Sequence, residues 1–142
     1  MKIAWALVAA LLMSAGATSQ NENPEARKSA LIERGKYIVE GVAMCGQCHT
    51  PRNSQGGPDS GQALQGAPLW LQPATPVGVW PSQAPRIAGI LPGSDDQMVT
   101  LLTTGIWRDG KRPRPPMPQF RMTPQDAQAV VAYLRSMNPS PQ

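Results

Sequence analysis

Apolar side chains recur at helical spacing in three segments of the chain, and each recurrence predicts an α-helix. In the first segment, residues 26–44, the side chains of Leu31, Ile38 and Val42 fall on one face. Gly35 lies in the middle of this segment, where a glycine weakens a helix by about 1 kcal/mol relative to alanine. We therefore expect a second helix to cross the first closely at Gly35.

The other two predicted helices have clear signals at their ends. For residues 94–104, Ser94 is a candidate N-cap and Gly105 follows the last helical residue. The last helix is expected to follow Thr123 as its cap, with Pro124 at its first position. The apolar positions are Met98, Leu101 and Leu102 in the earlier helix and Ala127, Val130, Val131, Leu134 and Met137 in the later one.

The stretch between the first two helices has a different character. Residues 50–93 contain eight prolines, seven glycines and only three charged side chains. No segment of the chain alternates as a strand does, so we predict an all-α fold of three to four helices with long ordered loops. A loop of this length is unusual in a compact domain, but its apolar residues indicate that it wraps a flat apolar object. The alternative for residues 53–62 is a partly disordered linker.

Both cysteines and the only histidine of the chain lie in one turn, Cys45-Gly46-Gln47-Cys48-His49. The spacing C-x-x-C-H is the attachment signature of haem c. Two thiols three residues apart at a helix end can form thioethers with the two vinyl groups at one porphyrin edge. The adjacent His49 then falls beneath the iron as its proximal ligand. The motif predicts one covalently bound haem c per chain.

Three other interpretations of this motif fit the sequence less well. A thioredoxin-like redox pair requires a preceding strand in a βαβ context, which the surrounding pattern does not provide. A structural zinc site requires four Cys or His ligands, and the chain has three such residues. A disulfide between Cys45 and Cys48 would suit an exported protein but gives His49 no role.

The first residues have the pattern of a targeting segment. Lys2 precedes an apolar run, residues 3–15, and Ala15-Gly16-Ala17 is an A-x-A cleavage site. Because about 20 apolar residues are needed to cross a bilayer, we predict a cleaved signal, a periplasmic location and no transmembrane anchor. The predicted divisions are a signal peptide (1–17), a flexible tether (18–25), the haem domain (26–138) and a tail (139–142).

Positive charge is concentrated in one part of the chain. Without Lys2, 12 basic and 9 acidic side chains remain, a formal charge of +3. The segment 108–121 is short and interrupted by prolines, and it matches no nucleic-acid-binding motif, so we expect no nucleic acid partner. It suits an acidic protein partner or the haem propionates. Its basic residues are Arg108, Lys111, Arg112, Arg114 and Arg121, opposed only by Asp109.

The second axial ligand of the iron cannot be a histidine, because the chain has no other. Methionine, lysine, a weak ligand or no ligand remain. Met117 is the outlier among the methionines, since it lies in Pro115-Pro116-Met117-Pro118, which we expect to be an extended, proline-stiffened segment. Such a segment holds a thioether at a fixed point. The others are expected in the signal (Met13), beside the motif (Met44), in the core (Met98, Met137) and before the last helix (Met122).

From residue 27 to residue 137 the chain resembles class I cytochromes c, most closely the small haem domains that serve bacterial periplasmic dehydrogenases. The matching motifs are Arg34-Gly35-x-Tyr37, C-x-x-C-H-T, Pro85-x-Ile87-Ala88-Gly89, Pro116-Met117-Pro118-x-Phe120 and Ala132-Tyr133-Leu134. The resemblance implies the class I cytochrome c fold, ligation by His49 and Met117, and a first helix that crosses the last with Gly35 near Val130 and Tyr133. Two features depart from those domains, which often occur in tandem: this chain has one attachment site, and Arg86 replaces the more usual asparagine.

The resemblance also implies the wider function and further contacts. The protein would be an electron carrier and not an enzyme, accepting electrons from a dehydrogenase and passing them to a terminal oxidase or another cytochrome. A proline carbonyl, of Pro68 or Pro85, would accept the Nδ1 proton of His49. Trp70, Trp80 and Arg86 are candidates to bind the haem propionates, with simple packing as the alternative for each tryptophan. The alternative function is a haem enzyme or gas sensor with an open or displaceable sixth site.

Overall fold

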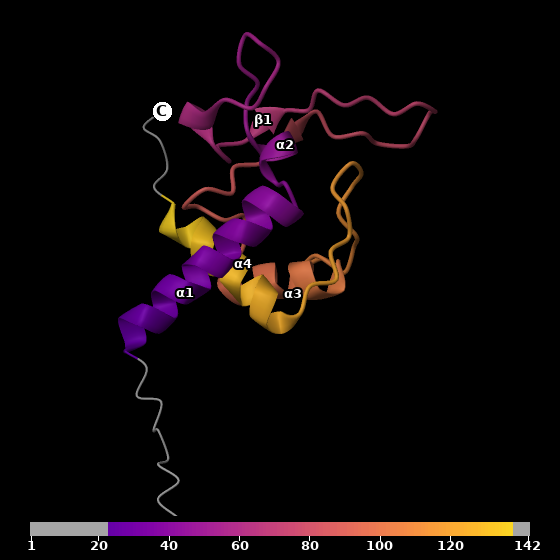
Figure 1. The fold of residues 1–142 in the computed structure, drawn as a ribbon. Coiled ribbons are helices and arrows are strands. Elements are labelled where there is room, and N and C mark those ends of the chain that lie inside the picture. The colour runs from indigo at the N-terminus through magenta and orange to yellow at the C-terminus, as the bar shows by residue number, and fades with distance from the viewer. Residues whose placement is uncertain (1–22, 138–142) are drawn as a thin grey trace, which may run out of the picture.

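The computed structural model describes residues 23–137 and is mostly helical (Figure 1). The predicted signal peptide, most of the predicted tether and the predicted tail lie outside these residues. Within them, no helix is both long and apolar enough to cross a membrane. The elements are α1 (Pro24–Tyr37), the π-helical turn η1 (Ile38–Val42), α2 (Gly46–His49), the 3₁₀ turn η2 (Ser60–Gln62), β1 (Ala67–Pro68), β2 (Gln83–Ala84), α3 (Asp95–Thr104) and α4 (Pro124–Ser136).

The first helix starts two residues earlier than predicted. The Asn23 side chain accepts a hydrogen bond from the Glu25 amide at 3.1 Å, and Pro24 occupies the first helical turn, where its missing N–H is not needed. The expected end of the helix also differs. After Tyr37 the chain widens into η1, closed by a 2.7 Å bond from the Ala43 amide to the Ile38 carbonyl.

α1 and α4 cross at Gly35, where the sequence predicts a close approach of two helices. Gly35 is buried, and a Cβ atom built on it would overlap the Ala129 carbonyl oxygen and lie 2.7 Å from Cβ of Tyr133. The expected partner Tyr133 is therefore confirmed, while Ala129 replaces Val130 as the nearest backbone. Beyond the end of α1, in η1, Glu40 Oε1 accepts a hydrogen bond from the Tyr133 hydroxyl at 2.5 Å.

The two later helices begin as predicted. Ser94 and Gln97 form a reciprocal capping box, and Gly105 ends α3 in the left-handed conformation at φ 65°. Thr123 accepts from the Asp126 amide at 3.1 Å and Pro124 opens α4. Both helices and η1 pack into one core, whose buried members are Ile38, Val39, Leu64, Ile87, Ala88, Leu91, Met98, Leu101, Leu102, Ala127, Val130, Val131 and Leu134.

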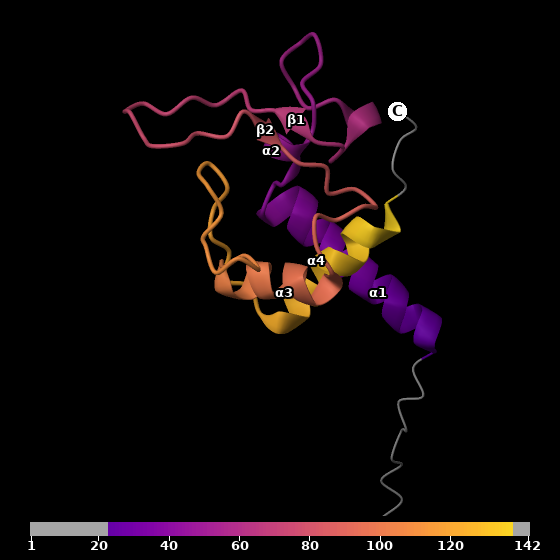
Figure 2. The same ribbon diagram turned by 180° about the vertical axis from the view of Figure 1, so that it is seen from behind.

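The predicted all-α fold is confirmed, and the strands among the described residues are two segments of two residues each. β1 and β2 pair antiparallel, with Ala67 opposite Ala84 and Pro68 opposite Gln83. Two residues are too few to show an alternating pattern, which is why the sequence gives no sign of them. Residues 69–82 between the strands form an arm that extends away from the helices in both ribbon views (Figures 1 and 2).

The loop before the arm is ordered, so the linker alternative for residues 53–62 is not supported. The Asn53 amide bonds to the Gly57 carbonyl at 2.8 Å, and the Asp59 amide bonds to the Pro51 carbonyl at 2.8 Å. The Asp59 side chain caps η2 by accepting from the Gly61 amide at 2.9 Å. These local bonds replace regular structure in a sequence that is rich in glycine and proline.

Candidate functional site

The C-x-x-C-H motif folds into the single turn α2, directly after the end of η1. The Cys45 amide donates to the Val39 carbonyl at 3.0 Å, and the His49 amide donates to the Cys45 carbonyl at 3.0 Å. Met44 makes the change of direction between the two helical segments, with φ 48°. Both thiols are half-buried and free, so the motif contains no disulfide. Burial raises the pKa of the Cys45 thiol to about 11, which keeps it protonated at neutral pH.

His49 is buried and oriented from both sides. Its Nδ1 atom lies 2.7 Å from the Pro85 carbonyl oxygen, and its own carbonyl accepts from the Gly66 amide at 2.8 Å. Because a carbonyl can only accept, Nδ1 holds the proton and the lone pair is on Nε2. Burial lowers the pKa of the ring, opposed by the bond to Pro85, so the imidazole is neutral at neutral pH. Of the two candidate prolines, Pro85 makes the bond, while Pro68 lies in β1.

The Pro85 carbonyl is held in place by the core beneath it. The amides of Ile87 and Ala88 both donate to the Leu64 carbonyl, at 3.0 and 3.1 Å, and the Gly89 amide donates to the Leu134 carbonyl of α4 at 2.8 Å. The motif Pro85-x-Ile87-Ala88-Gly89 thus connects the histidine to the helical core. A backbone carbonyl that accepts the Nδ1 proton in this way fixes the ring orientation of a metal-binding histidine.

Met117 lies in a turn and not in the extended segment that its prolines predicted. Its amide donates to the Arg114 carbonyl at 3.1 Å, which closes a four-residue turn around two prolines that have no N–H of their own. The side chain is half-buried, and the structure brings Met117 near His49. Both ribbon views show the segment between α3 and α4 rising from the helices toward the level of α2 (Figure 2).

The other described methionines occupy different environments. Met98 is 5% exposed in the core, as predicted, and Met122 and Met137 pack against the core. Met44 is 53% exposed beside the motif. Met137 is also half-buried and donates its amide to the Leu134 carbonyl at 3.4 Å, but it does so as the C-cap of α4 and not in a separate loop.

The two tryptophans of the arm already use their indole N–H groups. Trp70 Nε1 donates to the Gln47 carbonyl at 3.0 Å, and Trp80 Nε1 donates to the Leu71 carbonyl at 3.1 Å. Packing therefore explains both residues better than a bond to the propionates. Arg86 is half-buried next to Pro85 and has no hydrogen bond or ion pair with another described residue, so it remains a predicted propionate contact.

One residue of this region, Arg52, was not found from the sequence, and neither was its contact with Trp70. Arg52 stacks on the Trp70 ring, with its Cζ atom 4.4 Å from the ring centroid, and donates to the Gln47 carbonyl at 3.1 Å. Its position three residues after His49 was the only available signal. The stacking depends on the arm, which brings Trp70 back to Arg52 across 18 residues of chain.

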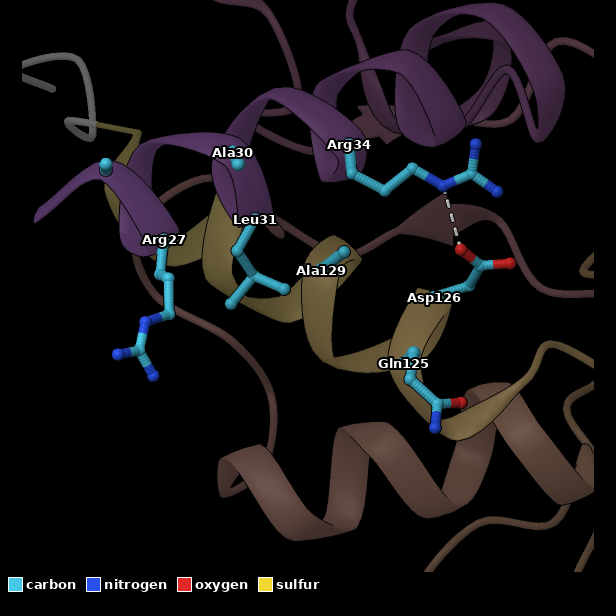
Figure 3. Close-up of a pocket in the computed structure, with 8 residues that line it drawn as sticks. Arg27, Ala30, Leu31, Arg34, Gln125, Asp126 and Ala129 are labelled. Atoms are coloured by element: carbon cyan, nitrogen blue, oxygen red, sulfur yellow. Dashed lines mark hydrogen bonds and ion pairs between the residues drawn. The ribbon is translucent and has the colours of Figure 1, made fainter. Parts of the chain in front are cut away.

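Two hollows open on the surface. A cavity of about 220 Å³ lies beside α2, where Met44, Gln47, Leu64 and Tyr133 line it. A wider groove of about 560 Å³ lies between α1 and α4 (Figure 3). The Arg34–Asp126 ion pair bridges this groove at 2.9 Å.

The donors fit a covalently attached haem better than the alternatives. Two free thiols flank one turn, and the neutral imidazole beside them has its Nε2 lone pair available. Across residues 23–137, no three His, Cys, Asp or Glu side chains gather where they could hold a metal ion by themselves, which leaves a zinc site without ligands. α2 also follows a helix and not the strand of a thioredoxin-like fold. The fold and site together define a c-type haem protein.

The comparison with known families agrees, because the family "Cytochrome c" matches residues 32–138. The chain belongs to the cytochrome c family, and its single C-x-x-C-H motif attaches one haem c. It is 33% identical to the fructose dehydrogenase cytochrome subunit of Gluconobacter japonicus over 114 residues, 73% of this chain and 21% of that protein. It is 31% identical to the alcohol dehydrogenase (quinone), cytochrome c subunit of Gluconacetobacter polyoxogenes over 125 residues, 78% of this chain and 25% of that protein.

A third relative is the diheme cytochrome c-type protein of Cereibacter sphaeroides, 31% identical over 108 residues, 72% of this chain and 34% of that protein. The chain thus spans between about a fifth and a third of the length of these relatives. The predicted resemblance to the cytochrome c domains of bacterial dehydrogenases is confirmed.

Proposed function

We propose that this cytochrome c is a one-electron carrier whose haem iron is held by His49 and Met117. The observation that supports it most is the pairing of a neutral, oriented histidine with a methionine fixed in a turn near it. The haem supplies one reversible electron through its iron, and a thioether ligand favours the ferrous state and raises the potential. If His49 and Met117 both hold the iron, they would leave no position on it for a substrate, which favours electron transfer over catalysis at the haem.

The residues around the site each have a part in this function. Pro85 keeps His49 in one tautomer and one orientation, which avoids rearrangement when the electron arrives. The Arg114–Met117 turn limits the freedom of the thioether. Cys45 and Cys48 are half-buried, so the attachment edge lies close to the surface where another protein can approach.

The donor is inferred from the relatives and from the exported state that we predict. Relatives of this chain are named as cytochrome subunits of fructose and alcohol dehydrogenases. We infer a periplasmic dehydrogenase as the electron donor, and a terminal oxidase or another cytochrome as the acceptor. The signal peptide at residues 1–17 and the periplasmic location are part of this proposal.

The basic segment suggests how a partner is recognised. Trp107 and Lys111 are joined by a 2.8 Å backbone bond, and the Gly110 amide donates to the Trp107 carbonyl at 2.9 Å, so residues 107–111 form a closed hairpin. We infer that an acidic surface of the redox partner docks here. The exposed basic side chains of the segment are Arg108, Lys111, Arg112, Arg114 and Arg121.

Substitution of Met117 tests the ligand set. The variant Met117→Ala should lose the weak long-wavelength absorption of a methionine–iron bond and have a lower midpoint potential, because the soft sulfur no longer stabilises ferrous iron. The measurements are the absorption spectrum of the oxidised protein and a redox titration. Met44→Ala is the matched control, since Met44 is exposed beside the motif and should leave both unchanged.

Carbon monoxide separates this function from that of a haem enzyme or gas sensor. The ferrous wild-type protein should bind little carbon monoxide at neutral pH, and Met117→Ala should bind it readily. Rapid, stoichiometric binding to the wild type would show an open or displaceable sixth site and would exclude the carrier mechanism. An unchanged Met117→Ala spectrum would direct attention to Met98 or Met122 as the ligand.

A further inference from the structure

The carbonyl of Gln47 accepts two hydrogen bonds from side chains outside the motif. Trp70 Nε1 donates to it at 3.0 Å, and Arg52 Nη2 donates to it at 3.1 Å. Gln47 lies between the two attachment cysteines, next to Cys48. These bonds therefore act on the segment that anchors the haem.

Arg52 is fixed from three directions. Its guanidinium stacks on the Trp70 ring at 4.4 Å, Nη1 donates to the Gly56 carbonyl at 3.0 Å, and Nη2 also reaches Gln47 Oε1 at 3.4 Å. These contacts join α2, the loop around Gly56 and the base of the arm. Stacking on an aromatic face with a planar fork of donors is an interaction that arginine makes and lysine cannot reproduce.

The positive charge of Arg52 has no partner of opposite charge. In the described part of the chain, no carboxylate forms an ion pair with Arg52, and its Nε atom is buried without a hydrogen bond. Burial of a charge in a medium of lower dielectric lengthens the range over which it acts. A fixed cation beside the haem attachment disfavours ferric iron relative to ferrous iron.

We propose that Arg52 and Trp70 form a clamp that positions the Cys45–Cys48 segment and raises the reduction potential of the attached haem. Both are positioning residues through their bonds to the Gln47 carbonyl, and Arg52 also acts on the haem through its charge. The clamp also ties the base of the arm to the attachment turn, so the arm and the haem edge move together. The inference rests on haem attachment at Cys45 and Cys48, and it does not depend on Met117 or on the identity of the partner.

Redox titration of the holoprotein tests the electrostatic part. Arg52→Gln should lower the midpoint potential, while Arg52→Lys, which keeps the charge, should recover most of the shift. The matched control is Arg108→Gln. Arg108 also lies over a tryptophan, Trp107, at 5.3 Å, but on the exposed hairpin. A shift in Arg52→Gln no larger than that in Arg108→Gln would overturn the proposal.

Amide hydrogen exchange tests the positioning part. Trp70→Phe keeps an aromatic face for Arg52 but removes the bond to Gln47, and it should speed exchange several-fold at the amides of residues 47–49 that α2 protects. Trp80→Phe is the control, because its indole donates within the arm to Leu71. Equal exchange rates in the two variants would also overturn the proposal. Should Arg52→Gln bind too little haem to titrate, this comparison decides alone.

The outcome is separable from that of the proposed function. If carbon monoxide shows that Met117 is not a ligand, the midpoint potentials of the wild type and of every variant are set by a different ligand, which they all share. The difference between Arg52→Gln and Arg108→Gln is then measured between proteins with the same ligand, so the two hypotheses fail independently.

Discussion

Gly66 decides, at the scale of one residue, how His49 is held. Its amide donates to the His49 carbonyl, and its φ of 86° lies in the left-handed region that side chains disfavour. A Cβ atom built there would lie 2.8 Å from the Arg86 backbone nitrogen and 3.0 Å from the Ala84 carbonyl oxygen. Any larger residue would push the backbone of residues 84–86 away from the histidine that Pro85 orients.

Replacement of Gly66 by alanine should therefore lower the free energy of unfolding by more than the positive φ alone would. Gly56 is the matched control, because its φ is 82° but nothing lies within 4 Å of a Cβ built on it. We expect Gly56→Ala to lose roughly 1–2 kcal/mol of unfolding free energy from the left-handed conformation. Gly66→Ala should lose about 1–3 kcal/mol more from overpacking. Urea unfolding of the holoproteins measures the difference, and equal losses would contradict the steric argument.

The residues expected to bind the haem or its iron were predictable because they are adjacent in sequence or lie in an unusual local sequence. Cys45, Cys48 and His49 form one motif, and Met117 stands out among prolines. The choice of Pro85 over Pro68 was not predictable, since it depends on how the two strands pair. Arg52 and Trp70 were missed as a pair for the same reason: their contact exists only after the arm folds back onto α2.

At the scale of elements, α1 and α4 are joined by packing at Gly35 and by the Arg34–Asp126 ion pair. Nε of Arg34 lies 2.9 Å from Oδ1 of Asp126, with the two side chains 53% and 29% exposed. The hydrogen bond from Arg34 holds the pKa of Asp126 below its ordinary value. Since the folded-state pKa is depressed, the pair stabilises the fold above the ordinary aspartate pKa and loses its effect as pH falls through the folded value.

A double-mutant cycle with Arg34→Gln and Asp126→Asn should reveal this pH dependence. The coupling free energy between the two positions should be fully present at about pH 6, above the ordinary aspartate pKa of about 4, and should decrease as pH falls through the lowered pKa of Asp126. Unfolding by urea at several pH values provides the measurement, and the cycle cancels the titration of all other groups. Because the pair is solvent-exposed, the coupling should be small. A coupling energy that stays constant as pH falls over this range would contradict the assignment.

Elements with strong local signals were predicted well, and those set by tertiary contacts were not. The caps at Ser94 and Thr123 are local features, and they fixed the starts of α3 and α4 correctly. The π-helical turn has no such signal. It depends on a contact that forms after α1 has crossed α4, the hydrogen bond from the Cys45 amide to the Val39 carbonyl. The strands are likewise too short to leave a pattern.

At the scale of the whole molecule, charged side chains are distributed unevenly over the loops that surround the haem site. The loop and arm from residue 60 to residue 85 contain no charged side chain, whereas the segment between α3 and α4 holds the basic cluster. Figures 1 and 2 show that the arm and this segment project toward the same side of the helical body. An approaching partner therefore meets positive charge on the same segment that contains Met117.

This positive charge should control the rate of electron transfer with charged reagents. We expect oxidation of the ferrous protein by anionic hexacyanoferrate(III) to slow several-fold as ionic strength rises from about 10 to about 150 mM, because salt screens the attraction. Reduction by cationic hexaammineruthenium(II) should show the opposite dependence. Stopped-flow absorption of the haem measures both rates.

The position of the charge, and not only its total, should determine this dependence. The double variant Lys111→Gln/Arg112→Gln removes one charge from the hairpin and one directly after it, and Lys28→Gln/Lys36→Gln removes two exposed charges from α1. If the basic segment steers the approach of an acidic partner, the hairpin variant should flatten the salt dependence more than the α1 variant does. Equal slopes in the two variants would mean that net charge alone steers the reagents and that the segment is an ordinary solvated surface.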